Sequence, residues 1–282
     1  MNNYAIEVEN LEKKFDKFSL GPINLKIPKG SIVGYIGRNG AGKSTTIKLI
    51  LNLLKTDNGK IRVLGEDIEN NYKIKDKIGV VFDDLFLPEE LKINDINSFL
   101  KDIYTKWDEN LFMKYVNKFN LSNDTIIKNY SRGMRMKLSI AIALSHKANL
   151  LILDEATSGL DPIVREEILD IILEFMQEEE NTVLISSHIL SDLEKIADYI
   201  AFIDDGKILF FEEKDELKDK YGICSLSDED LEKLNPSSVI GIRKHAFGNE
   251  AFVKKDDIAN EINFQKPSIE DIMIYFLKGD KK

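Results

Sequence analysis

A glycine-rich segment is the clearest candidate for chemistry in this sequence. It reads Gly-Arg-Asn-Gly-Ala-Gly-Lys-Ser from Gly37 to Ser44, and it matches the phosphate-binding loop pattern in full. Glycines let the backbone wrap closely around a triphosphate, and successive N–H groups with a following helix N-terminus stabilise its charge. The pattern predicts that Lys43 binds the β- and γ-phosphates of a nucleotide and that the Ser44 hydroxyl binds Mg²⁺. The predicted nucleotide-binding residues of this segment are Gly37, Arg38, Asn39, Gly40, Ala41, Gly42, Lys43, Ser44 and Thr45.

Two adjacent carboxylates form the second candidate. The apolar run Leu150–Leu153 reads as a buried strand, and it is followed directly by Asp154 and Glu155. In a parallel α/β sheet, ligands bind outside the carboxyl ends of the strands, so we expect both side chains beside the phosphate loop. We expect Asp154 to hold Mg²⁺ and Glu155 to orient and deprotonate an attacking water. An acidic pair after a strand is also ordinary turn chemistry, so this prediction depends on the loop.

These residues need a sheet to bring them together. The segment Ile32–Ile36 is a predicted strand before the phosphate loop, and a helix is predicted from Lys43 to about Leu54. Upstream, two alternating segments separated by Gly-Pro and Pro-Lys-Gly turns predict an antiparallel β subdomain at the N-terminus. Further strands alternate with helical stretches, which predicts an α/β fold with a parallel, phosphate-loop sheet core. The other predicted strands are Tyr4–Val8, Ile23–Ile27, Lys60–Leu64, Ile78–Phe82, Thr182–Ser186, Ile200–Ile203 and Lys207–Phe211.

The middle of the chain interrupts this alternation. Residues from about 84 to 148 are almost wholly helical in pattern and predict a helical insertion subdomain. A later helix begins at Asp161–Pro162, with aspartate as N-cap and proline at the first helical position, and is predicted to run toward Glu180. From about Tyr221 the composition shifts. We therefore expect a nucleotide-binding domain over 1–220 and a small accessory region over 221–282. The predicted helices of the insertion are Ile93–Tyr104, Glu109–Phe119 and Arg132–Ser145.

The composition is that of a globular protein with a sizeable core, since 43% of the 282 residues are hydrophobic. The net charge of −10 has the wrong sign for non-specific binding to phosphate backbones, so no nucleic-acid partner is expected. No stretch approaches the roughly 18 apolar residues of a membrane span, and the start resembles no secretion signal. The sequence therefore predicts a chain that stays inside the cell and does not itself cross a membrane.

Together these motifs resemble the ATP-binding-cassette (ABC) ATPases. The family's signature, ideally Leu-Ser-Gly-Gly-Gln, is similar to Tyr130–Met134, which departs at three of five positions but keeps Ser131 and Gly133. The resemblance implies that these two residues contact the γ-phosphate bound by an opposite subunit. The segment Ser158–Pro162 resembles the family's dimer-contacting loop. His188 occupies the place of a histidine that bonds the γ-phosphate and helps to position the water.

Two further positions follow from the resemblance. Phe15 is similar to the aromatic residue that stacks on adenine, with Phe18 as an alternative. Asp83 stands where the family usually has a glutamine that binds Mg²⁺ and senses the membrane partner. Aspartate keeps an oxygen ligand but adds a negative charge, so we expect metal affinity and partner coupling to differ here.

The resemblance implies an ATP-hydrolysing subunit of a membrane transporter of exporter type, with Lys43, Glu155 and His188 in catalysis. It further implies ATP and Mg²⁺ as cofactors, a homodimer or a heterodimer with a second ABC ATPase, and separate transmembrane permease subunits. The expected location is cytoplasmic, peripheral on the inner face of the membrane.

Three other readings are possible. A soluble ABC ATPase of translation or repair usually needs two nucleotide domains or a long insertion, and this chain has one phosphate loop. A GTPase is suggested by Asn117–Asn120, but the carboxylate that reads guanine is missing. A small-molecule kinase would leave the signature segment and His188 without a role.

Overall fold

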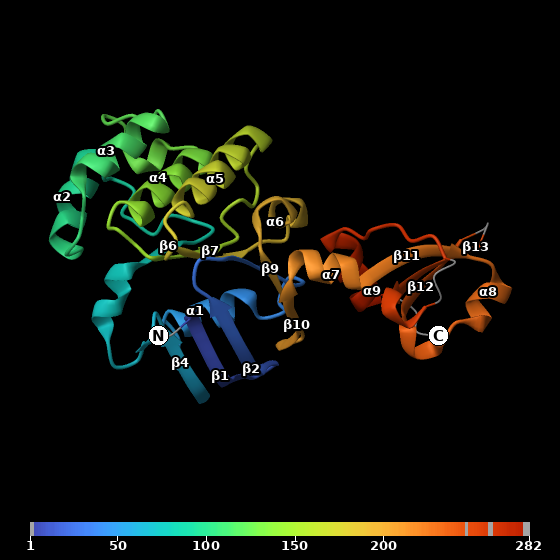
Figure 1. The fold of residues 1–282 in the computed structure, drawn as a ribbon. Coiled ribbons are helices and arrows are strands. Elements are labelled where there is room, and N and C mark those ends of the chain that lie inside the picture. Colours follow the sequence, from blue (N-terminus) through green and yellow to red (C-terminus); the bar gives the residue numbers. More distant parts are fainter. Residues whose placement is uncertain (1–2, 246–247, 259–261, 279–282) are drawn as a thin grey trace. The chain divides into compact units, whose positions relative to one another are not determined.

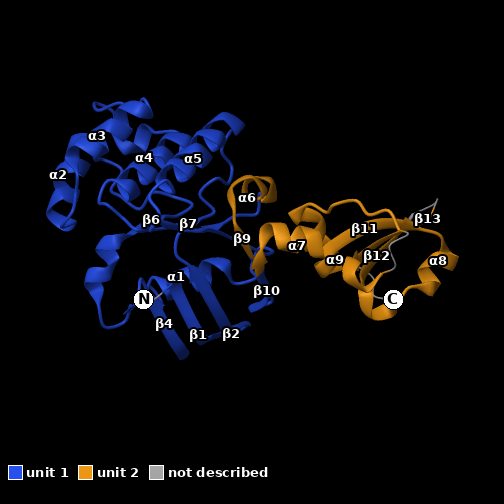
Figure 2. Ribbon diagram, viewed as in Figure 1, with its two compact units in different colours: residues 1–189, 201–211 blue, residues 190–200, 212–282 orange. Residues whose placement is uncertain are grey.

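The computed structural model describes residues 3–245, 248–258 and 262–278 (Figure 1). Contacts within the chain divide it into two compact units (Figure 2). The first unit consists of residues 1–189 and 201–211, and the second of residues 190–200 and 212–282. The candidate site residues all belong to the first unit.

A six-stranded sheet forms the centre of the nucleotide-binding fold. Its strand order is β10-β9-β3-β8-β7-β6, and the pairs β3–β8, β8–β7 and β7–β6 are parallel. The strands β3, β7 and β8 are buried along their whole length, which explains their continuous apolar sequences. The carboxyl ends of these strands meet at one edge, as the sequence pattern predicts. The bounds are β3 (Ile32–Ile36), β6 (Ile78–Val81), β7 (Leu150–Asp154), β8 (Thr182–Ser186), β9 (Tyr199–Asp204) and β10 (Lys207–Glu213).

A four-stranded antiparallel sheet, in the order β2-β1-β4-β5, forms the predicted N-terminal β subdomain. Its first two strands are longer than the sequence pattern indicates and pair as far as Phe15 and Phe18. This hairpin places Phe18 near the phosphate loop. The bounds are β1 (Tyr4–Phe15), β2 (Phe18–Pro28), β4 (Asn58–Val63) and β5 (Glu66–Asp67).

Helices cover the six-stranded sheet. In Figure 1, α2 to α5 lie on one side of β6 and β7, and α1 lies on the other side, near β1 and β2. The helical subdomain is built from α2, α3 and α4, as predicted, with a short 3₁₀ turn before α4. The bounds are α1 (Lys43–Ile50), η1 (Tyr72–Lys77), α2 (Ile93–Ile103), α3 (Glu109–Lys118), η2 (Ile127–Asn129), α4 (Arg132–Leu144) and α5 (Pro162–Phe175).

Two helices end earlier than the sequence pattern predicts. Helix α1 stops at Ile50 because Asn52 adopts a left-handed conformation with φ of 50°, which reverses the chain. Helix α5 begins at Pro162 as expected but ends at Phe175 instead of near Glu180. Its last turn is closed by the Asn181 side chain, which donates to the Phe175 carbonyl oxygen at 2.8 Å. A helix extended to Glu180 would have placed three consecutive glutamates, at positions 178 to 180, at the negative end of the helix dipole, which is unfavourable.

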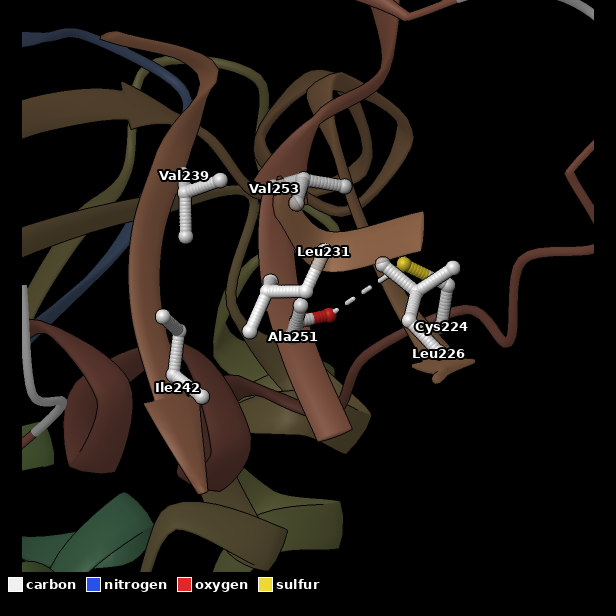
Figure 3. Close-up of a cluster of buried hydrophobic side chains, with 7 residues drawn as sticks. All are labelled: Cys224, Leu226, Leu231, Val239, Ile242, Ala251 and Val253. Atoms are coloured by element: carbon white, nitrogen blue, oxygen red, sulfur yellow. Dashed lines mark hydrogen bonds between the residues drawn. The ribbon is translucent and has the colours of Figure 1, made fainter. Parts of the chain in front are cut away.

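The second unit contains a three-stranded antiparallel sheet in the order β11-β13-β12. Figure 3 shows the apolar side chains that this sheet and α8 bury together. Cys224 belongs to this core, its thiol donates to the Ala251 carbonyl oxygen, and burial raises its pKa to about 11. The Cys224 side chain therefore serves as a packing group in this core, and its thiol is not expected to react. The bounds are α6 (Leu190–Ile196), α7 (Lys214–Lys220), β11 (Tyr221–Leu226), α8 (Asp228–Lys233), η3 (Pro236–Ser238), β12 (Val239–His245), β13 (Gly248–Lys254), η4 (Lys255–Asp257) and α9 (Ile269–Lys278).

Within the described part of the chain, none of the helices combines the length and the apolar character that crossing a membrane requires.

Candidate functional site

The phosphate loop connects β3 to α1 and takes a shape that needs its glycines. A β-carbon on Gly37 would lie 2.3 Å from the carbonyl oxygen of Ile203, so no side chain fits there. Gly42 is the N-cap of α1 and has φ of 112°, a conformation that favours glycine. The first backbone N–H groups of α1 have no partner within the helix and therefore provide anion-binding donors beside the loop.

The Lys43 side chain is buried and lies over the loop. Its Nζ donates to the carbonyl oxygens of Gly37 at 2.8 Å and of Arg38 at 3.4 Å. The same Nζ lies 3.4 Å from Oε1 of Glu155. The Lys43 ammonium is thus held between the phosphate loop and the Glu155 carboxylate.

The loop is attached to the end of β9. The Arg38 guanidinium donates to both carboxylate oxygens of Asp204, at 2.9 and 3.1 Å, and these hydrogen bonds together with the charge of Asp204 raise the pKa of Arg38. The backbone N–H of Gly206 donates to the Ala41 carbonyl oxygen at 3.0 Å. The predicted site residue Arg38 therefore positions the loop with its side chain directed toward Asp204.

The acidic pair lies at the carboxyl end of β7, and Ser186 on the neighbouring strand holds both of its members. The Ser186 hydroxyl donates to Oδ1 of Asp154 at 2.6 Å. The backbone N–H of Glu155 donates to the Ser186 carbonyl and hydroxyl oxygens, each at 3.1 Å. Glu155 has φ of 56°, which is uncommon for a residue with a side chain and marks a constrained turn. Sequence reasoning assigned no role to Ser186, although its place directly before Ser187 and His188 was a usable signal.

His188 is in contact with Glu155. Nδ1 of the imidazole lies 2.5 Å from Oε2 of the carboxylate, and because a carboxylate only accepts, Nδ1 carries the hydrogen. The His188 side chain is about half exposed. Glu155 therefore lies between an ammonium group and an imidazole N–H, so three residues that are far apart in sequence form one connected set.

These groups line a cavity of about 370 Å³ in the first unit. Asp83 lines it from the loop after β6, and Phe18 lines it from β2. Phe15 is absent from this lining, is 44% exposed and stacks on Phe18 with ring centroids 6.3 Å apart. Of the two aromatic residues, Phe18 is the one positioned to contact a ligand in the cavity. The lining residues are Phe18, Asn39, Gly40, Gly42, Lys43, Ser44, Thr45, Asp83, Arg132, Glu155, Ser158 and His188.

The predicted site residues Gly37, Arg38, Ala41 and Asp154 lie beside the cavity without lining it, whereas Ser131 and Gly133 lie at the start of α4. Ser131 is the exposed N-cap of α4 and accepts from the backbone N–H of Met134 at 3.2 Å. A β-carbon on Gly133 would lie 3.6 Å from Val164, which is an ordinary contact, so this chain's packing does not require a glycine there. Neither residue lines the cavity of its own chain.

The comparisons with known proteins agree with this geometry. The family model described as ABC transporter matches residues 20–158. The lantibiotic transport ATP-binding protein SrtF of Streptococcus pyogenes is 38% identical over 213 residues, covering 74% of this chain and 91% of the relative. The chain belongs to the ABC transporter family. This ABC transporter chain is also 31% identical to the bacitracin transport ATP-binding protein BcrA of Bacillus licheniformis, over 97% of each chain.

The solved structure of an ATP-binding subunit of an ABC transporter has a TM-score of 0.70 and 25% identity to this chain. The match covers 76% of this chain and 92% of the chain in that structure. The predicted α/β phosphate-loop fold is thereby confirmed, as is the prediction that the protein is an ATP-binding and ATP-hydrolysing ABC subunit. The segment Asn117–Asn120, which suggested a GTPase, covers the last two residues of α3 and the turn after it, and it does not line the cavity.

Proposed function

We propose that this ABC ATPase pairs with a second ABC ATPase chain, identical or related, so that two ATP molecules are enclosed between them. The placement of Ser131 and Gly133 is the observation that carries this proposal. Both lie on the N-terminal end of α4, outside the cavity of their own chain, and Gly133 is not needed for packing within it. Gly133 is partly exposed, and a glycine that its own chain does not need for packing allows close approach by another molecule. A helix N-terminus attracts an anion.

Hydrolysis follows from the connected set of Lys43, Glu155 and His188. The Lys43 ammonium binds the β- and γ-phosphates of ATP. The phosphate oxygens replace the backbone carbonyl oxygens of Gly37 and Arg38 as its hydrogen-bond acceptors. The Glu155 carboxylate then accepts a proton from the attacking water. The His188 imidazole, whose Nδ1–H is bonded to that carboxylate, orients it and leaves Nε2 for the γ-phosphate or the water.

The residues around the loop fit a magnesium ion. Mg²⁺ prefers oxygen ligands, and the Ser44 hydroxyl and the Asp154 carboxylate are oxygen donors on the two elements that meet there. Oδ1 of Asp154 is bonded to Ser186, which orients the carboxylate and leaves Oδ2 for the metal. Asp83, which lines the same cavity, is a further oxygen donor. Bound Mg²⁺ would neutralise charge on the phosphates.

We further propose that separate transmembrane subunits dock near Asp83 and α2, on the cytoplasmic face of the membrane. Large apolar side chains are exposed in this region: Phe86 is 77% exposed, Phe99 50% and Ile103 51%. A contiguous patch of exposed apolar side chains marks a protein interaction site, and we propose that these three residues contribute to one. The names of two relatives describe transport of a lantibiotic and of bacitracin, and we propose export as the direction of transport for this chain.

Purification from native membranes tests the transport proposal. A tagged protein, recovered from detergent-solubilised membranes of its own cells, is expected to bring a multi-spanning membrane protein with it. The double variant Phe86→Ser with Phe99→Ser should lose this partner while its ATP affinity remains, because neither residue lines the cavity. The measurement is mass spectrometry of the recovered complex. Recovery of only soluble proteins with the wild type would contradict membrane coupling.

The Gly133→Ala variant tests the pairing proposal. An added methyl group has room within the chain and improves helix propensity, so the melting temperature should not fall. Overpacking against a second chain costs about 1–3 kcal/mol, so ATP turnover is expected to fall roughly tenfold. Steady-state phosphate release measures the turnover, and sedimentation in the presence of ATP measures the pairing of two chains. Unchanged turnover and unchanged pairing would show that Gly133 does not meet another chain.

A further inference from the structure

The turn between β9 and β10 lies against the phosphate loop. Asp204, the last residue of β9, accepts two hydrogen bonds from the Arg38 guanidinium, at 2.9 and 3.1 Å. Two such bonds from one guanidinium to one carboxylate fix the direction of both side chains. The Asp204 side chain is 19% exposed and that of Arg38 is 59% exposed, so the more buried carboxylate provides the anchor. The end of β9 thus holds the loop through a side chain, in addition to the backbone bond from Gly206 to Ala41.

The same turn is joined to strand β2, which carries Phe18. The backbone N–H of Gly21 donates to the Gly206 carbonyl oxygen at 2.7 Å. A β-carbon on Gly206 would lie 2.2 Å from the Ser19 carbonyl oxygen, so the two backbones approach more closely than a side chain would allow. One turn therefore contacts both the phosphate loop and the strand that places Phe18 at the nucleotide cavity.

The phosphate loop also packs directly on this junction. A β-carbon on Gly42 would lie 2.6 Å from a methyl carbon of Leu20 and 3.3 Å from one of Ile203. The loop is therefore in close contact with both β2 and β9. Because close-packed groups transmit small displacements to their neighbours, a shift at the end of β9 would move the loop relative to β2.

The Arg38 guanidinium can serve nucleotide binding in two ways that have opposite consequences. A free guanidinium would bind a phosphate group directly, because its N–H donors match the phosphate oxygens. A guanidinium bonded to Asp204 instead fixes the backbone of the loop. Arg38 does not line the cavity, and its charge is balanced by the carboxylate at 2.9 Å. The geometry therefore favours the second role.

We propose that Asp204 is a positioning residue for nucleotide binding, which through Arg38 and the adjoining turn holds the phosphate loop at a fixed place relative to Phe18. The inference rests on the nucleotide site described above and adds a residue that lies outside its cavity. A loop fixed in its binding conformation gains affinity because less ordering is needed when the ligand binds. The loop binds the β-phosphate, which ATP and ADP share, so the affinity for both should depend on Asp204. Glu155 and His188 follow β7 and β8 instead, so hydrolysis of bound ATP should not.

Calorimetric titration with ADP and steady-state ATP turnover test this proposal. The variants Arg38→Ala and Asp204→Ala are each expected to bind ADP about fivefold more weakly, the upper scale for an exposed ion pair, and to raise the KM for ATP by a similar factor while kcat is unchanged. The double variant should lose no more than either single variant, because the loss of one partner already removes the interaction. Asp205→Asn is the matched control, since it removes a charge from the same turn and asparagine tolerates the φ of 44° there. It should bind ADP like the wild type.

Four results would overturn the proposal. Tighter ADP binding by Asp204→Ala would show that Arg38, once released, binds phosphate directly. A lower kcat with an unchanged KM would place the pair in the hydrolysis step. Losses that add in the double variant would show that the two residues act separately. Wild-type ADP affinity in both single variants, with or without a lower melting temperature, would show that the pair serves the fold alone. If the wild-type protein itself did not bind ADP, the nucleotide site would fail, which is a different outcome from any of these.

Discussion

Replacing Glu155 with glutamine is expected to lower the ATP turnover number by about 10²–10⁴-fold, the usual share of general acid–base catalysis. The amide has the shape of the carboxylate but cannot accept the proton of the attacking water. It can still accept the His188 Nδ1–H, and the phosphate loop is untouched, so ATP should bind at least as tightly as to the wild type. Single-turnover phosphate release and equilibrium ATP binding measure the two quantities separately.

Glu178→Gln is a suitable control because this exposed glutamate lies in the turn before β8, outside the nucleotide cavity. It removes the same charge from the same unit and should leave turnover unchanged. Wild-type turnover in the Glu155 variant would show that another group activates the water. A parallel loss of ATP affinity would show that Glu155 acts by shaping the site.

The Lys43→Ala variant is expected to weaken both ATP and ADP binding by roughly 100-fold, because it removes charge-assisted hydrogen bonds to the β- and γ-phosphates. The ammonium group also braces the loop through Gly37 and Arg38, so its removal loosens the site before ligand arrives. Calorimetric titration with each nucleotide measures the loss. The loss of affinity separates this variant from Glu155→Gln, which is expected to lose turnover alone.

Lys48→Ala provides the matched control, since Lys48 lies on the same short helix but is exposed to solvent. It should bind both nucleotides like the wild type. Melting temperatures of both variants report whether the fold is kept. If Lys43→Ala bound ADP with wild-type affinity, the loop would not hold the β-phosphate through this lysine.

The two strongest motifs could be predicted from the sequence because their chemistry is local. The phosphate loop is defined by consecutive residues, and its strand and helix flank it directly, so Gly37–Ser44 needed no long-range information. The acidic pair could be predicted for the same reason, because it lies directly at the end of its own buried strand. Helix ends were harder to predict, because Asn52 and Asn181 terminate α1 and α5 through backbone geometry and side-chain bonding.

Contacts between distant segments decided the rest of the site. Ser186 holds the acidic pair only because β8 lies beside β7, with Asp154 in register with Ser186. Likewise, the β1–β2 hairpin turns Phe18 toward the cavity and leaves Phe15 outside its lining. No spacing along the chain encodes either choice.

The order of residues alone determined that this chain binds a nucleotide triphosphate on an α/β sheet, since backbone glycines, a lysine and a helix start act within one short segment. Only the tertiary structure decided which side chains surround that segment: Arg132 from α4 reaches the cavity, while its neighbours Ser131 and Gly133 stay outside it. The physical reason is that successive helix residues point in different directions around the axis. Where each of them points depends on how the helix packs against β6 and α5.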